Sequence, residues 1–204
     1  MNNILVNGKD LTPSKVVCIG RNYVAHIEEL GNEMPDEMVV FNKPNSAISD
    51  ILRSQVAGED LHYESELCFV VEDGKFSAVG FGLDLTKRGL QAQLKKKGLP
   101  WERAKAFDGS VLFSRFLAIP GAVTGLSLDL HVDGKVRQSG GVNLMLYPPQ
   151  VILEELQGYT TLEDGDVIMT GTPAGVGRVR TGEHFEGRVL FDDRLLVRAS
   201  WVAQ

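Results

Sequence analysis

The chain has 204 residues, of which 43% are hydrophobic and 24% are charged, and its net charge is −6. This composition is ordinary for a globular protein, while the acidic balance argues against a nucleic-acid-binding protein and a polybasic membrane anchor. No apolar run approaches the ~18 residues of a membrane span, and the N-terminus lacks a signal-peptide pattern. The length predicts one domain, or one domain with a small appendage.

The two cysteines, Cys18 and Cys68, are too few for a disulfide framework. Both lie in apolar runs that are typical of buried strands, where a free thiol behaves as a small apolar group. A reducing cytosol is the simplest compartment for such thiols, so the sequence predicts a cytoplasmic protein.

Glycines fall between short apolar runs along the whole chain, a pattern typical of many strands joined by tight turns. In the first half the pattern predicts strands over residues 16–19, 39–41, 63–71 and 81–85. It also predicts a short helix over residues 23–30, with Asn22 as its N-cap and Gly31 after its end. A second helix is predicted over residues 86–97, where Gly98 and Pro100 stop it.

The second half of the chain is mostly strand-like. Residues 127–132 alternate between apolar and polar side chains, and a hairpin signal follows them at residues 132–135. A short amphipathic helix is predicted over 149–156, a strand over 167–170, and a final hairpin over 189–201 that turns at residues 192–193. Because strands dominate and long alternating βα units are absent, the fold class is a β-rich α+β domain.

Glu64 and Glu66 lie two residues apart in the strand predicted over residues 63–71. Such side chains project from the same face of a strand, so the two carboxylates point the same way. Like charges on one face repel unless a positive charge lies between them, and a divalent metal ion supplies one. The alternative is a solvent-facing edge that carries two glutamates without a function.

Asp84 is a third candidate ligand, because it follows an apolar run and precedes the helix predicted from residue 86. Alternatively, it is an aspartate stabilised near the N-terminus of that helix. If the three carboxylates converge, their oxygen ligands favour Mg²⁺, Mn²⁺ or Ca²⁺ over Zn²⁺. An octahedral ion on three protein oxygens keeps about three open positions, two of which a 2-oxo acid can fill.

His26 and Glu29 lie three residues apart in the first predicted helix and therefore meet on one face of it. A glutamate beside a histidine fixes the imidazole ring and raises its basicity, so the pair can activate a water molecule. The alternative is a surface pair that contributes a few tenths of a kcal/mol. The helix is short enough to act as a lid that orders when a ligand binds.

Residues 170–177 (Thr-Gly-Thr-Pro-Ala-Gly-Val-Gly) are rich in glycine and threonine but do not match a phosphate-binding loop. Their free N–H groups can hold a carboxylate, or the segment is a plain tight turn. Lys95–Lys97 are predicted as a solvated last helical turn. Lys105 lies among apolar neighbours, where it either extends to solvent or contacts a substrate carboxylate.

These segments form a collinear series over nearly the whole chain: residues 18–23 with His26 and Glu29, then 41–44, 62–67, 83–86, 96–101, 104–108 and 165–177. The ordered set resembles the fumarylacetoacetate hydrolase family, most closely its small single-domain members of the acylpyruvate hydrolase and oxaloacetate decarboxylase type. Residues 86–89 (Thr-Lys-Arg-Gly) depart from the family pattern, which often has an acidic residue at the last position. The stretch over 71–81 is shorter than usual and lacks a helix signal.

The resemblance implies a mixed β-sandwich roll of the family's C-terminal-domain type with a few short helices, usually as a homodimer. Residues 1–204 then form one catalytic domain with an N-terminal extension over about residues 1–14. The resemblance also implies Mg²⁺ or Mn²⁺, with Ca²⁺ as a substitute, on Glu64, Glu66 and Asp84. The remaining implied site residues are His26, Glu29 and Lys105 in catalysis, and Arg21, Gln91, Lys105 and Thr172 in substrate binding.

The leading functional hypothesis is metal-dependent hydrolysis of a carbon–carbon bond in a 2,4-dioxo acid such as an acylpyruvate, which releases the pyruvate enolate. In it His26, oriented by Glu29, activates water, and Lys105 supplies positive charge. The alternatives on the same chelating site are an oxaloacetate decarboxylase or tautomerase and a 2-oxo-dienoate isomerase or hydratase. An alternative of another class is a non-catalytic β-rich protein with a structural divalent cation.

Overall fold

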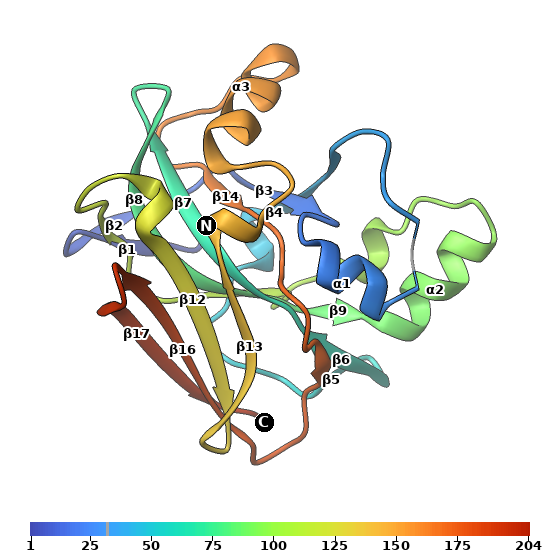
Figure 1. Cartoon of the computed structure of the whole chain (residues 1–204). Coiled ribbons are helices and arrows are strands. Elements are labelled where there is room, and N and C mark those ends of the chain that lie inside the picture. Colours follow the sequence, from blue (N-terminus) through green and yellow to red (C-terminus); the bar gives the residue numbers. More distant parts are fainter. Residues whose placement is uncertain (32) are drawn as a thin grey trace.

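The computed structural model describes residues 1–31 and 33–204, and strands are its main regular secondary structure (Figure 1). The α-helices of the described residues are α1 (Val24–Glu29), α2 (Arg88–Lys96) and α3 (Pro149–Tyr159). Single 3₁₀ turns lie at Asn45–Ala47, Glu102–Ala104, Val123–Gly125 and Val142–Leu144.

The largest sheet is mixed and has the strand order β10-β8-β7-β14-β3-β4, with β11 beside β8. Its strands are β3 (Lys15–Gly20), β4 (Val39–Pro44), β7 (Ser65–Glu72), β8 (Lys75–Asp84), β10 (Val111–Phe113), β11 (Leu117–Ala118) and β14 (Val167–Met169). The pair β14–β3 is parallel, whereas β7 and β8 form a long antiparallel hairpin.

A second sheet, in the order β13-β12-β16-β17, packs face to face on the first. Its strands are β12 (Leu126–Val132), β13 (Lys135–Gly141), β16 (His184–Phe191) and β17 (Arg194–Val202). The shared core contains Phe69 and Phe81 from the first sheet and Phe185 from the second. Gly187 of β16 permits this close packing, because a Cβ atom there would lie 2.3 Å from the Phe81 ring.

Smaller elements complete the roll. A small sheet has the order β15-β6-β5, with β9 beside β6. The bounds of these strands and of the N-terminal hairpin are β5 (Gln55–Val56), β6 (Glu59–Tyr63), β9 (Thr86–Lys87), β15 (Gly177–Arg178), β1 (Ile4–Val6) and β2 (Lys9–Leu11). Helix α3 covers part of the large sheet, where Ile152 and Leu156 pack against Val17 and Ile168.

The structure confirms the predicted fold class, a β-rich α+β sandwich with a few short helices. The hairpins predicted at residues 132–135 and 192–193 are present, and Asp192 and Asp193 both adopt positive φ angles. The stretch over 71–81 also lacks a helix, since Asp73 and Gly74 form the turn that joins β7 to β8.

Several predicted boundaries differ from the structure; the strand predicted over 81–85, for example, is the end of β8, which begins at Lys75. Asn22 is not the N-cap of α1: Tyr23 holds that position, and the Asn22 amide instead bonds backbone groups of Tyr147 and Thr170. The second helix begins at Arg88 because Thr86–Lys87 pairs with β6 as strand β9. The strand predicted over residues 63–71 is divided at Glu64, which lies between β6 and β7.

None of the helices in the described part of the chain has the length and apolar character to cross a membrane. The hairpin β1–β2 lies within the first 14 residues, which the sequence analysis assigns to an N-terminal extension. That division of the chain stays a prediction.

Candidate active site

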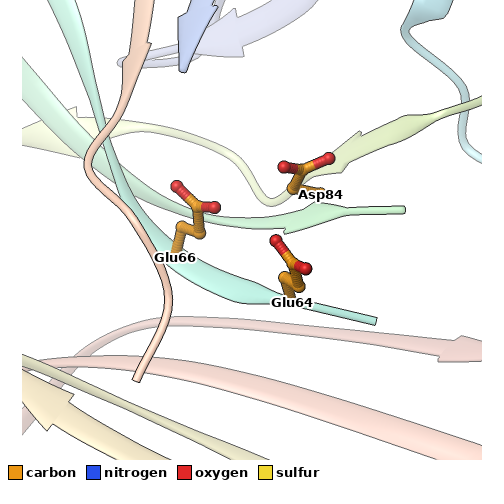
Figure 2. Close-up of side chains that lie close together, drawn as sticks. All are labelled: Glu64, Glu66 and Asp84. Atoms are coloured by element: carbon orange, nitrogen blue, oxygen red, sulfur yellow. The ribbon is translucent and has the colours of Figure 1, made fainter. Parts of the chain in front are cut away.

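The β7–β8 hairpin brings three buried carboxylates together (Figure 2). Glu66 lies near the start of β7, Glu64 immediately before it, and Asp84 at the end of the antiparallel neighbour β8. Their ligand oxygens lie within 4.8 Å of one another, and Glu66 and Asp84 are each only 1% exposed. Strand register therefore explains how residues twenty positions apart share one site.

Cationic side chains from three separate segments contact two of these carboxylates. Lys105 Nζ lies 2.8 Å from Glu64 Oε2 and 2.6 Å from Asp84 Oδ2. Lys43 of β4, which is 0% exposed, lies 2.8 Å from Asp84 Oδ1, and Arg88 of α2 pairs with Glu64. Glu66 instead accepts a backbone hydrogen bond from Gly171 N–H at 2.6 Å.

This uneven pairing shifts the pKa values of Glu64 and Glu66 in opposite directions. Burial alone raises the pKa of Glu64, but the charges of Lys105 and Arg88 outweigh it and hold that pKa well below its usual range. Burial also raises the pKa of Glu66, and the negative charges of Asp84 and Glu64 raise it further despite the Gly171 N–H. Glu66 is therefore the least compensated carboxylate of the three.

The donor set fits a hard divalent cation. Three carboxylates without sulfur or imidazole ligands match the preference of Mg²⁺, Mn²⁺ and Ca²⁺. The position of Lys105 shows that the site attracts positive charge, since its ammonium group lies between Glu64 and Asp84. Burial lowers the pKa of Lys105, but Asp84 and Glu64 together raise it well above its ordinary value.

His26 of α1 is buried and lines the same pocket as the three carboxylates. Its Nδ1 lies 3.4 Å from Glu29 Oε2, so the predicted pair is formed, with Glu29 behind the ring rather than in the pocket lining. Burial lowers the pKa of His26, and the nearby charge of Glu64 and the hydrogen bond with Glu29 offset this only in part. The imidazole ring is therefore predominantly neutral at neutral pH.

The glycine- and threonine-rich segment after β14 holds carboxylates, but they belong to the protein itself. Gly171 N–H donates to Glu66, as described above, and Gly175 N–H donates to both carboxylate oxygens of Glu29, at 3.0 and 3.1 Å. Both glycines have positive φ angles, which residues with a side chain rarely adopt. The loop thus contacts a carboxylate of the acidic cluster and the partner of His26.

The pocket places the other predicted site residues around the acidic cluster. Arg21, Gln91, Lys105 and Thr172 all line it. Arg88 Nη1 donates to Gln91 Oε1 at 3.0 Å, which orients this side chain one turn along α2. Every site residue predicted from the sequence except Glu29 therefore faces the pocket.

Sequence reasoning missed several charged residues of the site. Lys43 lies in the segment 41–44 of the collinear series, but nothing in its local pattern indicates a fully buried ammonium group. Arg88 was treated only as part of a departure from the family pattern. Lys95 is exposed as predicted, yet it also lines the pocket and lies 5.4 Å from the centre of the Trp101 ring.

Comparison with known proteins agrees with this geometry. The model of the fumarylacetoacetate (FAA) hydrolase C-terminal family matches residues 15–200. The chain belongs to this family. It is 37% identical over 204 residues to oxaloacetate tautomerase YcgM of Escherichia coli (strain K12), with 92% of each chain covered. It is also 34% identical to the mitochondrial oxaloacetate tautomerase FMP41 of Saccharomyces cerevisiae, with 86% of each covered.

Among solved structures, the fumarylpyruvate hydrolase of Pseudomonas aeruginosa, in complex with Mn²⁺ and pyruvate, superimposes with a TM-score of 0.88. The two proteins are 27% identical, and the match covers 100% of this chain and 96% of the other. A 5-carboxymethyl-2-hydroxymuconate delta-isomerase from Mycobacterium smegmatis matches with a TM-score of 0.75 and 29% identity, over 96% of this chain and 81% of the other. The proteins that this chain resembles therefore include enzymes with several reaction types.

Replacing Glu66 with glutamine should stabilise the metal-free protein. The change removes one of three mutually repelling charges, and the new amide oxygen can still accept the Gly171 N–H bond. We expect the melting temperature of the metal-free protein to rise by up to about 4 °C, which corresponds to about 1 kcal/mol for a chain of this size. The shift that Mn²⁺ produces in the unaltered protein should be lost.

Thermal melts with and without Mn²⁺ measure both effects. Glu72→Gln is the matched control, because Glu72 is the exposed last residue of the same strand. An unchanged Mn²⁺-induced shift in Glu66→Gln would contradict the assignment of Glu66 as a ligand.

Proposed function

We propose that this protein is a divalent-metal-dependent enzyme that interconverts the keto and enol forms of oxaloacetate. The observation that carries the proposal is the buried His26, which is paired with Glu29 and lines the same pocket as the three carboxylates. Keto–enol interconversion needs a group that removes and returns one proton beside a bound 2-oxo acid. The oxaloacetate tautomerases among the relatives support this choice over the hydrolysis favoured by the sequence.

In this proposal His26 moves the proton at C3 of the substrate. Glu29 accepts the Nδ1–H, so the Nε2 lone pair is left free to act as the base. Glu29 is itself held by Gly175 N–H, which fixes the orientation of the ring. The same imidazole then returns the proton to carbon or to the enolate oxygen, so no atom is gained or lost.

Glu64, Glu66 and Asp84 would hold the metal ion, which we propose to be Mg²⁺ or Mn²⁺. When bound, the ion supplies Lewis-acid stabilisation of negative charge on the substrate oxygens. Lys105 adds a positive charge from the chain itself, and the Thr172 hydroxyl lies in the pocket lining as a further hydrogen-bond donor.

The second carboxylate of oxaloacetate has a matching cationic rim in Arg21 and Lys95, which both line the pocket. Partial desolvation, followed by the charges of Arg21 and Arg88, lowers the pKa of Lys95. An anion placed between these cations relieves their mutual repulsion. A dicarboxylate therefore suits this pocket better than a monocarboxylate.

Cleavage of an acylpyruvate is the second candidate, favoured by the likeness to the fumarylpyruvate hydrolase structure. In that reaction His26 removes a proton from water, the hydroxide adds to the C4 carbonyl, and the C3–C4 bond breaks to leave an acid and pyruvate enolate. Decarboxylation of oxaloacetate ends on the same enolate, and one relative from Dictyostelium discoideum is named for that activity. Because the three carboxylates share a pocket with His26, a purely structural cation site is the weaker alternative.

An oxaloacetate assay tests the proposed function directly. The purified protein with Mn²⁺ should accelerate the loss of enol absorbance, and EDTA should abolish the acceleration. A coupled assay for pyruvate, run in parallel, reports decarboxylation, and acetylpyruvate in place of oxaloacetate reports hydrolysis. Rapid release of pyruvate without prior enol conversion would replace the tautomerase proposal with one of these alternatives.

Replacing His26 with alanine should lower the rate of tautomerisation by about 10²–10⁴-fold, because the proton then lacks a positioned base. In the unaltered protein the rate should fall as pH decreases through a midpoint below 6.5, since protonation removes the base and burial lowers its pKa. The pH–rate profile of the variant should lack this acid limb. His184→Ala, at an exposed position on β16, serves as the control and should keep both rate and profile. An acid limb that persists in the His26 variant would assign it to another group.

Replacing Lys95 with methionine should raise the KM for oxaloacetate about tenfold with little change in kcat, as expected for the loss of one charge-assisted contact. Inhibition by pyruvate, which has a single carboxylate, should stay within about twofold. Lys96→Met is the matched control, because Lys96 is the next residue of α2 and is exposed. Equal losses for oxaloacetate and pyruvate would show that Lys95 does not select the second carboxylate.

A homodimer and a cytoplasmic location also remain part of the proposal. The dimer rests on the family resemblance, and sedimentation velocity of the purified protein measures it. The location rests on the free cysteines, which are both buried. Relatives occur both in E. coli and, by name, in mitochondria, so fractionation of the source cells is the relevant measurement.

A further inference from the structure

Gln138, on strand β13 of the second sheet, makes three hydrogen bonds at the edge of the active site although it does not line the pocket. Its side chain is 1% exposed. Its Oε1 accepts the backbone N–H of Ser65 at 2.9 Å. Its Nε2 donates to Thr172 Oγ1 and to the carbonyl of Pro173, both at 2.8 Å.

These partners occupy informative positions. Ser65 lies between the two candidate metal ligands Glu64 and Glu66. Thr172 and Pro173 lie within the loop whose Gly171 and Gly175 N–H groups hold Glu66 and Glu29. A single amide group therefore joins the start of β7 to the loop that contacts both the acidic cluster and the partner of His26.

The same amide determines what the Thr172 hydroxyl can do. Because Gln138 Nε2 donates to Thr172 Oγ1, this oxygen acts as an acceptor and its own proton is left to donate elsewhere. The competing acceptor, the carbonyl of Pro173, lies 3.5 Å from Oγ1, which is long for a hydroxyl hydrogen bond. That carbonyl already accepts the shorter bond from Gln138. The Thr172 proton thus remains available to a group in the pocket, which Thr172 lines.

The loop and β13 also pack too closely for the loop to shift without loss of these bonds. A Cβ atom on Gly175 would lie 1.9 Å from the carbonyl oxygen of Arg137, the residue before Gln138. A Cβ atom on Gly140 would lie 3.0 Å from Pro173. Glycines at both contacts let the backbones approach closely, and this approach brings the Gln138 amide within reach of the loop.

We propose that Gln138 is a positioning residue that acts through the loop of residues 171–175. It directs the Thr172 hydroxyl toward a substrate carboxylate and holds Gly171 N–H in place against Glu66, a candidate metal ligand. The first role rests on the proposed function, because it needs an anionic 2-oxo acid in the pocket. The second role concerns the protein alone.

A double-mutant cycle on binding, rather than on turnover, tests the first role. Pyruvate is titrated into the Mn²⁺-loaded unaltered protein, Gln138→Met, Thr172→Val and the double variant. Each single change should weaken pyruvate binding about tenfold, as for one hydrogen bond to a charged group. The double variant should also lose about tenfold rather than a hundredfold, because the two residues act through one interaction.

Titration of the metal-free proteins with Mn²⁺ tests the second role. Gln138→Met should weaken Mn²⁺ binding about tenfold, the lower end for residues that orient metal ligands, whereas Thr172→Val should stay within about twofold. Gln157→Met is the matched control. Gln157 lies on α3, away from the site, and its amide donates to the Gly74 carbonyl at 2.7 Å. This variant should keep the affinities for both Mn²⁺ and pyruvate. If the methionine variant does not fold, Gln138→Asn serves instead, because it keeps the amide and shortens its reach.

Losses of pyruvate affinity that multiply to about a hundredfold, or an unchanged Mn²⁺ affinity in Gln138→Met, overturn the inference. A protein that binds Mn²⁺ and pyruvate as expected but does not convert oxaloacetate refutes the proposed function and leaves the inference intact. An unaltered protein that binds no Mn²⁺ overturns both.

Discussion

The repulsion among three buried carboxylates is the constraint on which the site depends. Their ligand oxygens lie within 4.8 Å of one another. At such separations each pair of full negative charges repels by about 3–4 kcal/mol, at an effective dielectric constant of about 20. A domain whose whole stability is about 5–15 kcal/mol cannot carry this cost without compensation. The surrounding structure must therefore supply positive charge, whatever the chemistry of the site.

The fold supplies that charge from elements that are distant in the sequence. Lys43 comes from β4 at one edge of the large sheet, Arg88 from α2, and Lys105 from the segment after the 3₁₀ turn at Glu102–Ala104. Glu66 receives only a partial positive charge, from the backbone N–H of Gly171. This distribution leaves a local deficit of positive charge next to Glu66. A bound metal ion is therefore stabilised most by its attraction to this carboxylate.

Local sequence patterns identified the paired groups as candidates, and the family resemblance favoured them over the non-functional alternatives. Glu64 and Glu66 flank Ser65 at the start of β7, and His26 and Glu29 lie one helical turn apart in α1, so short sequence spacing brings each pair together. Asp84 joins them only through the register of the β7–β8 hairpin. The apolar runs of the sequence indicate the two strands but do not specify which residues pair.

Contacts between elements could not be predicted in this way. Lys43 reads as an ordinary polar residue at a strand end, yet the packing buries it completely. Asn22 has the residue type of a helix N-cap, but its amide donates to backbone carbonyls of two other segments. Gln138 reaches the active site from the opposite sheet, so its role depends on how the two layers pack. Such roles follow from tertiary packing, which residue type and spacing do not specify.

Charge balance also narrows the choice of substrate. Lys43, Arg88 and Lys105 equal the three carboxylates in number, but all three cations pair with Glu64 or Asp84. A divalent ion adds two positive charges, and Arg21 and Lys95 at the rim add two more. A dicarboxylate would offset part of this positive charge at both ends of the pocket, whereas a monocarboxylate would offset it at one end only. The charges of the pocket thus agree with the proposed substrate, a short dianionic 2-oxo acid, from which His26 would need to move only one proton.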